Sequence, residues 1–293
     1  MALDPPRPPF LGASDAPHPA AILLGAPLDR TESFKSGTAE APRRIRQVSD
    51  VIETYSPLWD ADLAELPFAD WGDVRLDGLS MPESLDAITA AAGRAMDVGL
   101  PILLGGEHTA TIGAVRAAHQ RYGELIVVQV DAHADLRTEY DGAALSHATV
   151  MRRIADELGI DRIVQCGIRS GTREEFQLAR SCLSSGPSLE LSEAVLTRLR
   201  EAPVYLTIDI DVLDPASAPG TGCPEPGGAS FHELMALLRA LEGCNVVGCD
   251  VMEVLPAADC NDISSVAAAK LVREMALEFG PRRARSGVSS KPR

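Results

Sequence analysis

Hydrophobic residues in this chain fall into short runs separated by longer segments with a helical pattern. The runs contain few polar positions and do not alternate between polar and apolar, which is typical of strands buried on both faces of a sheet. We therefore predict strands over residues 20–25, 68–71, 100–104, 125–130, 162–167, 204–208 and 246–249.

The segments between these runs have the periodicity of amphipathic helices. The clearest is 231–242, where Leu234, Leu238 and Leu241 recur on one face and Ser230 with Glu233 has the spacing of a capping box. Further helices are predicted over 82–98, 110–122, 192–201 and 264–278. Repeated strand-then-helix order predicts a single α/β domain with a mostly parallel sheet covered on both faces.

The two ends of the chain differ in composition from the rest. Residues 1–19 are rich in proline, and residues 281–293 carry basic side chains among small polar ones. We predict a proline-rich N-terminal arm, a catalytic domain over 20–280 and a basic C-terminal tail, and expect both ends to be mobile.

Charge and composition exclude several classes of function. The chain has 42 acidic and 27 basic residues, a formal net charge of −15, which repels nucleic acids and anionic membranes. No apolar run approaches the roughly 18 residues of a membrane span, and prolines occupy the place of a signal peptide. The six cysteines form no C-x-x-C pair. We expect a cytoplasmic protein without nucleic-acid or membrane partners, disulfides or a sulfur-bound zinc ion.

Histidines and carboxylates directly follow three of the predicted strands. In a parallel sheet these positions meet at one edge, where ligands bind, and residues two apart on an extended chain point the same way. The resulting candidate metal ligands are His108, Asp131, His133, Asp135, Asp209 and Asp211.

Such a set of ligands calls for cations. Four carboxylates crowded together could not all stay ionised without positive charge nearby, and two divalent ions would balance them. Oxygen and imidazole donors without thiolates suit Mn²⁺. A lone Asp-x-Asp after a strand is more often a turn or a helix cap, but the three motifs together favour a metal site.

Five motifs in order resemble those of the ureohydrolase family, which includes arginases and agmatinases, and agmatinases are the most similar members. They are Gly-Gly-Glu-His at 105–108, Asp-Ala-His-Ala-Asp at 131–135, Ser-His-Ala at 146–148, Asp-Ile-Asp-Val-Leu-Asp-Pro at 209–215 and Glu-Val-Leu-Pro at 253–256. The resemblance covers roughly residues 20–280.

The resemblance implies an arginase-type three-layer α/β/α sandwich with an eight-stranded sheet, assembled as a homo-oligomer, a trimer or a hexamer. It also implies two Mn²⁺ ions per chain, with Ni²⁺ or Co²⁺ as alternatives. One ion would be bound by His108 and Asp135, the other by His133 and Asp211, with Asp131 and Asp209 bridging the pair.

The resemblance further implies catalytic roles for His147, as the proton-transfer residue, and for Glu253, as the contact to the substrate guanidinium. A water shared by two metal ions loses a proton near neutral pH, and the hydroxide can attack a guanidinium carbon that Glu253 orients. The expected enzyme is a hydrolase of C–N bonds in linear amidines that releases urea and an amine, most simply putrescine from agmatine.

The loop between Asp135 and His147 bears on the substrate. Glu139 and Asp141 would favour the terminal ammonium of agmatine, whereas Arg137 would favour a carboxylate, as in 4-guanidinobutyrate. We rank agmatine first, guanidinobutyrate or a related guanidino acid second and arginine third.

Two readings from other classes stay open. A deacetylase-like hydrolase would use the same sheet with one metal ion, which the second set of ligands opposes. An inactive ureohydrolase-like binding subunit would be expected to lose ligands, and all six are present.

Overall fold

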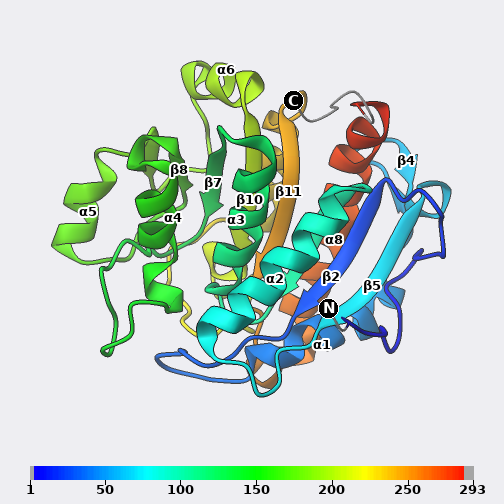
Figure 1. The fold of residues 1–293 in the computed structure, drawn as a ribbon, viewed down its shortest axis with the longest axis horizontal. Helices are drawn as coiled ribbons and strands as arrows, with labels where there is room; N and C mark the ends of the chain where they lie inside the picture. The colour runs from blue at the N-terminus through cyan, green and yellow to red at the C-terminus, as the bar shows by residue number, and fades with distance from the viewer. Residues whose placement is uncertain (1–2, 287–293) are drawn as a thin grey trace.

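A nine-stranded sheet forms the centre of the protein in a computed structural model that describes residues 3–286, and the side chains of residues 3–281 (Figure 1). The strand order is β1-β5-β2-β6-β11-β10-β7-β8-β9. Every neighbouring pair is parallel except β1 and β5. The strands are β1 (Leu3–Asp4), β2 (Ala21–Ala26), β5 (Phe68–Val74), β6 (Leu100–Gly105), β7 (Ile126–Val130), β8 (Ile163–Cys166), β9 (Ser184–Gly186), β10 (Pro203–Asp209) and β11 (Asn245–Met252).

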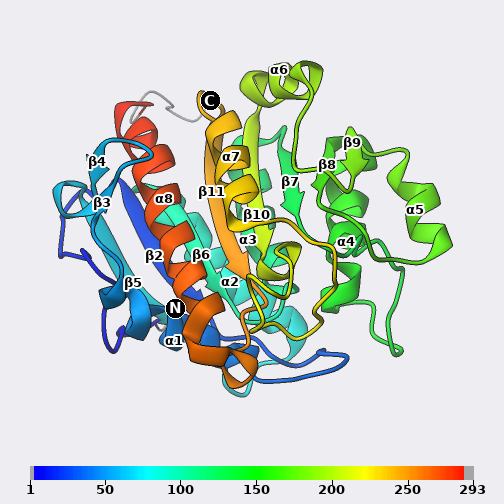
Figure 2. The same ribbon diagram turned by 180° about the vertical axis from the view of Figure 1, so that it is seen from behind.

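Helices cover both faces of the sheet, as the two opposite views show (Figures 1 and 2). One layer contains α2 (Met81–Met96), α3 (Ala110–Tyr122), α4 (Val150–Leu158) and α5 (Arg173–Ala179), and the other contains α1 (Ala41–Val48), α6 (Glu193–Glu201), α7 (Phe231–Ala240) and α8 (Ile263–Ser286).

Each sheet face has its own apolar core. In β2, Ile22 and Leu24 pack on the α2 side, and Ala21 and Leu23 pack on the α8 side. Both faces of the strand are therefore buried, which explains the unbroken apolar runs. The predicted three-layer α/β fold is confirmed.

The structure contains all seven predicted strands and two more in the main sheet. The additional strands are β1, of two residues, and β9, the polar triplet Ser184–Gly186. Segments this short carry no periodicity that a sequence pattern could reveal. Without the antiparallel β1, the sheet has the eight strands that the resemblance implied. A separate hairpin pairs β3 (Tyr55–Ser56) with β4 (Ala61–Asp62).

The described part of the proline-rich arm is packed rather than free. Leu3 and Asp4 pair with β5, and Phe10 is 2% exposed with its ring edge-on to Phe68 at 5.8 Å between centroids. The backbone N–H of Phe10 donates to Asp70 at 3.0 Å. Burial of an aromatic ring and strand pairing offset the entropy lost in ordering this segment. The domain boundary after residue 19 stays a prediction.

At the other end, α8 extends beyond the predicted end of the domain, to Ser286. The rest of the predicted basic tail, residues 287–293, lies outside the described residues. Within residues 3–286, no helix is both long enough and apolar enough to cross a membrane.

The centre of the sheet positions the site. Strands β6, β11, β10 and β7 are adjacent and parallel, so their carboxyl ends meet. The loop after β2 crosses the end of β6 so closely that a Cβ on Gly106 would lie 1.9 Å from the carbonyl oxygen of Leu28. Glycine is therefore required there, and the loop residues reach the same edge as the ligands.

Candidate metal centre

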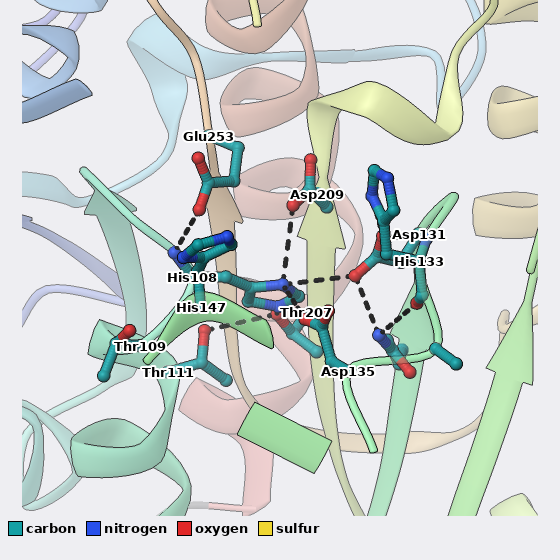
Figure 3. A network of polar contacts seen from close by, with 12 residues as sticks. His108, Thr109, Thr111, Asp131, His133, Asp135, His147, Thr207, Asp209 and Glu253 are labelled. Carbon is teal, nitrogen blue, oxygen red and sulfur yellow. Dashed lines mark hydrogen bonds and ion pairs between the residues drawn. The ribbon is translucent and has the colours of Figure 1, made fainter. Parts of the chain in front are cut away.

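The six predicted metal ligands lie together at the carboxyl ends of the central strands. Figure 3 labels all of them except Asp211. His108 follows β6, the motif with Asp131, His133 and Asp135 follows β7, Asp209 ends β10, and Asp211 lies in the 3₁₀ turn after it. Glu253 directly follows β11. Four adjacent strands thus deliver these side chains to one edge of the sheet, where we expected the residues that follow three of them.

The imidazole of His108 is the most enclosed part of this cluster, at 1% exposure. Its Nδ1 lies 3.2 Å from Asp131, 3.1 Å from Asp135 and 3.5 Å from Asp209, in each case measured to the Oδ2 atom. This nitrogen nevertheless has no hydrogen-bond partner with acceptable geometry in the described structure. A buried nitrogen surrounded by carboxylate oxygens fits a metal ligand.

A second group forms around His133. Its Nδ1 lies 2.8 Å from Oδ2 of Asp211 and 3.8 Å from Oδ1 of Asp131. Asp131 therefore turns one oxygen towards each histidine. Its two oxygens are held in place by N–H donors, Oδ1 by the backbone of His133 at 2.6 Å and Oδ2 by Nε2 of Gln129 at 2.7 Å.

The electrostatics of the cluster indicate a deficit of positive charge. Burial, followed by repulsion from Asp131, raises the pKa of Asp135 to about 7. Burial, followed by repulsion from Asp211, raises the pKa of Asp209 well above its ordinary value. Four carboxylates at this spacing cannot all be ionised unless cations compensate them. The donor set therefore fits two divalent ions.

Two site residues have a strained backbone. Asp135 has φ 52° and Glu253 has φ 63°, in the left-handed region that non-glycine residues rarely adopt. Such conformations persist only where the surrounding structure imposes them, and they concentrate at functional sites. Both side chains face the cluster.

Glu253 is held beside the cluster by its neighbours. Its Oε1 accepts the backbone N–H of His108 at 2.6 Å. Burial, followed by repulsion from the carboxylate of Glu32, raises the pKa of Glu253 well above its ordinary value. Burial raises the pKa of Glu32 to about 7. Two adjacent carboxyl groups of this kind share a proton until a cation, such as a guanidinium, replaces it. Glu32 was not singled out by sequence reasoning.

His147 lies on the loop side of the same cavity. Its backbone N–H donates to Oγ1 of Thr31 at 3.1 Å, its Nε2 is 3.2 Å from Oγ of Ser33, and its ring is edge-on to Tyr140 at 5.7 Å. Burial lowers the pKa of His147 from its ordinary value. The imidazole is therefore neutral at neutral pH and can accept a proton.

A cavity of about 270 Å³ joins these groups and is also lined by Arg137, Tyr140 and Glu175. Nε of Arg137 lies 3.5 Å from Glu175, and its guanidinium stacks on Tyr140 at 5.0 Å. The two acidic loop residues of the prediction, Glu139 and Asp141, are exposed and do not line it. Asp141 and Gly142 both have positive φ between the bridged pair Tyr140 and Ala143, as in a tight hairpin turn.

Sequence reasoning missed the polar residues that hydrogen-bond to the predicted metal ligands or to the backbone next to them. Gln129 orients Asp131, Thr207 contacts His108, and Glu175 accepts the backbone N–H of Leu136 next to Asp135. Gln129 and Thr207 are polar residues inside otherwise apolar strands. An isolated polar residue in a buried strand needs a partner, and this signal could have identified them.

The fold and the site together define a class. A parallel α/β sheet with four carboxylates, two histidines and a separate glutamate at the ends of its central strands is the arrangement of a ureohydrolase-type enzyme. The model of the arginase family matches residues 19–277. The chain belongs to the arginase family.

Individual relatives place the chain within the family. It is 42% identical to an agmatinase of Bacillus anthracis over 262 residues, 87% of this chain and 90% of that protein. It is 38% identical to a guanidinobutyrase of Pseudomonas aeruginosa, over 87% of this chain and 85% of the relative. The solved agmatine ureohydrolase of Thermoplasma volcanium superposes with a TM-score of 0.83 at 32% identity, over 96% of each chain. The protein is thus a hydrolase of guanidino C–N bonds, and agmatinases are among its most similar relatives.

Metal binding to this cluster should release protons. Burial alone would lower the pKa of His133, but the carboxylates of Asp211 and Asp131 outweigh burial and raise this pKa to about 10. The pKa of His108 is raised well above 6.5, because Asp131 and Asp135 outweigh burial in the same way. Both histidines are therefore protonated at pH 7 without a cation, and a ligand nitrogen must be neutral.

We expect at least two protons to leave as two manganese ions bind, one from each histidine and more from carboxyl groups that are still protonated. The apparent affinity should fall about tenfold per displaced proton for each unit by which the pH is lowered between pH 9 and 7. Titration calorimetry in buffers of different protonation enthalpy measures this release. Binding that is independent of pH and buffer would show that the histidines are not ligands.

Proposed function

We propose that the protein is a binuclear manganese amidinohydrolase that hydrolyses agmatine to putrescine and urea. The observation that carries this proposal is the convergence of His108, His133 and four aspartates at one cavity, which all of them except Asp131 line together with Glu253. The similarity to agmatinases at 42% identity supports the choice of substrate.

The distances suggest how two ions would be held. His108 and Asp135 would bind one ion, because Nδ1 of His108 lies 3.1 Å from Oδ2 of Asp135. His133 and Asp211 would bind the other, because Nδ1 of His133 lies 2.8 Å from Oδ2 of Asp211. Asp131 turns one oxygen to each pair, and Asp209 would complete the bridge. When bound, the two cations would lower the pKa of a shared water and so supply a nucleophile at neutral pH. Ni²⁺ and Co²⁺ suit the same donors.

The protein's own groups would do the rest of the chemistry. Glu253, fixed by the N–H of His108, would orient the substrate guanidinium by a charge-assisted contact. His147 faces the cavity as a neutral base and would carry the proton that the departing amine needs. Thr31 and Ser33 hold this imidazole in position.

Guanidinobutyrate is the second candidate substrate, because Arg137 lines the cavity and would attract a carboxylate. On the acidic side, Glu175 lines the cavity beside Arg137, whereas Glu139 and Asp141 are exposed. A role for these two in binding an ammonium stays a prediction, and solvent screening should make it smaller than that of Glu175. The trimer or hexamer and the cytoplasmic location also stay predictions.

Urea release from agmatine, guanidinobutyrate, guanidinopropionate, arginine and free guanidine, with manganese and nickel compared, tests this proposal. We expect agmatine with manganese to give the highest kcat/KM. Absence of urea release from all of these compounds, with two metal ions bound, would contradict the proposed function.

The Arg137→Ala variant separates the two leading substrates. A charge-assisted contact contributes about 1.5–3 kcal/mol, so the loss of a carboxylate contact should lower kcat/KM for guanidinobutyrate by roughly tenfold or more. Agmatine should be unaffected or improved, because the variant removes a positive charge near its ammonium. Glu139→Gln and Asp141→Asn, assayed with agmatine and with uncharged butylguanidine, measure the part played by the exposed carboxylates. A loss of agmatine turnover in Arg137→Ala would exclude this arrangement.

A further inference from the structure

A chain of hydrogen bonds leads from His108 away from the site and into the protein interior. Nε2 of His108 lies 2.9 Å from Oγ1 of Thr207, which lies 3.3 Å from Oγ1 of Thr111 (Figure 3). Oγ1 of Thr111 donates to Oδ2 of Asp250 at 3.0 Å. All four side chains are at most 1% exposed. The chain therefore connects a candidate metal ligand to a carboxylate that the reaction does not use.

Three elements bring these residues together. Thr111 lies in the first turn of α3, Thr207 in β10 and Asp250 in β11. Thr207 and Asp250 are direct neighbours in the parallel register of the two strands. Asp250 is flanked by buried Cys249 and Val251 in β11, and an apolar side chain would be buried there at less cost. The burial of a carboxylate at this position therefore indicates that the charge itself has a role.

The carboxylate fixes the direction of every hydrogen bond in this chain. Burial raises the pKa of Asp250 to about 6, so the group is ionised at neutral pH and can only accept. Its Oδ2 receives the hydroxyl hydrogens of Thr111 and, at 2.9 Å, of Tyr205.

The ionised carboxylate of Asp250 also fixes the direction of the hydrogen bonds made by the hydroxyl groups of Thr111 and Thr207. Because the hydrogen of Thr111 is committed to Asp250, its oxygen can only accept from Thr207. The hydrogen of Thr207 then points away from His108, and its oxygen accepts from the imidazole. Nε2 of His108 must carry that hydrogen, so when the imidazole is neutral its lone pair is on Nδ1.

Nδ1 faces the carboxylates of Asp131, Asp135 and Asp209, at 3.1–3.5 Å. Without a metal ion a proton on Nδ1 compensates their charge, and a divalent cation between the donors takes the place of that proton. We propose that Asp250 is a positioning residue that acts through Thr111 and Thr207 to hold His108 in the Nε2-protonated form and present Nδ1 to a divalent cation. The inference rests on the proposed metal centre and adds a residue that controls it.

The Asp250→Leu variant tests this role, because leucine has nearly the same shape but cannot accept from Thr111 and so no longer fixes the direction of the chain. Metal-free protein is titrated with Mn²⁺ while the free ion is followed by electron paramagnetic resonance. We expect one of the two manganese sites, the one containing His108, to weaken about 10–100-fold, as is typical when the outer partner of a ligand is removed. The other site should keep its affinity.

Matched variants separate this role from a general loss of structure. Tyr205→Phe removes the other donor to Asp250 without changing the direction of the chain, so both sites should retain their affinity. Thr111→Val breaks the chain and should repeat the selective weakening, whereas Thr111→Ser keeps the hydroxyl and should not. This pair also tests the inference if Asp250→Leu fails to fold.

Two results would overturn the inference while leaving the metal centre intact. They are unchanged affinity of both sites in Asp250→Leu and Thr111→Val, or an equal weakening of both sites together with a lower unfolding temperature of the metal-free protein. If the unaltered protein bound no manganese, nickel or cobalt, the proposed function would fail and this inference with it.

Discussion

Asp131→Asn should abolish tight binding of both metal ions and lower kcat/KM by more than the roughly 10–100-fold that accompanies loss of an outer hydrogen-bond partner. Each oxygen of Asp131 faces a different histidine, and each also accepts an N–H, from Gln129 and from the backbone of His133. An asparagine must direct its own NH₂ at one of these donors in either orientation. The variant therefore loses a negative charge and one acceptor at the centre of the cluster. Metal content by plasma mass spectrometry and urea release are the measurements.

An exposed aspartate provides the control. Asp156→Asn makes the same chemical change in α4, where the ion pair with Arg152 is open to solvent and contributes little. Metal content and activity should stay at the level of the unaltered protein. If Asp131→Asn retained two metal ions and near-normal activity, Asp131 would not bridge the two ions. Asp209→Asn, at the other proposed bridge, should show the same double loss.

Glu253→Gln should lower kcat/KM for every guanidino substrate while both metal ions remain bound. The glutamine can still accept the N–H of His108 through one oxygen, so its position should be kept. The guanidinium loses an ionised partner in a buried site, a change that typically costs 2–5 kcal/mol, or roughly 30- to 4,000-fold in kcat/KM. Steady-state kinetics with agmatine, together with metal analysis, measures both parts of this expectation.

The substrate tail provides a control within the same variant. Butylguanidine has no charged tail, and it should lose as much as agmatine because the substitution acts on the shared guanidinium. A loss restricted to agmatine would place Glu253 at the tail of the substrate instead of its reacting end. An unchanged kcat/KM for both compounds would show that Glu253 does not bind the substrate guanidinium.

The local sequence predicted much of the fold. The unbroken apolar runs identified the seven longer parallel strands, because a strand buried on both faces needs apolar side chains at every position. The strands β1 and β9 and the packing of Phe10 were not predictable, because a few residues gain their order only from the partner they pair with or cover. The order of the strands in the sheet could not be predicted either, because it depends on how the crossover helices pack and not on any one segment.

For the site, the sequence by itself determined which side chains carry the chemistry. The spacing of two in Asp131, His133 and Asp135 fixes a common direction within one segment, and the accumulation of carboxylates and histidines already calls for cations. The tertiary structure alone decided that the ends of β6, β7, β10 and β11 are neighbours. It also decided that Asp141 lies in an exposed turn and that Asp250 lies behind His108. The physical reason is that a short segment fixes the direction of its own side chains, whereas charge compensation and hydrogen-bond direction depend on atoms brought together from distant parts of the chain.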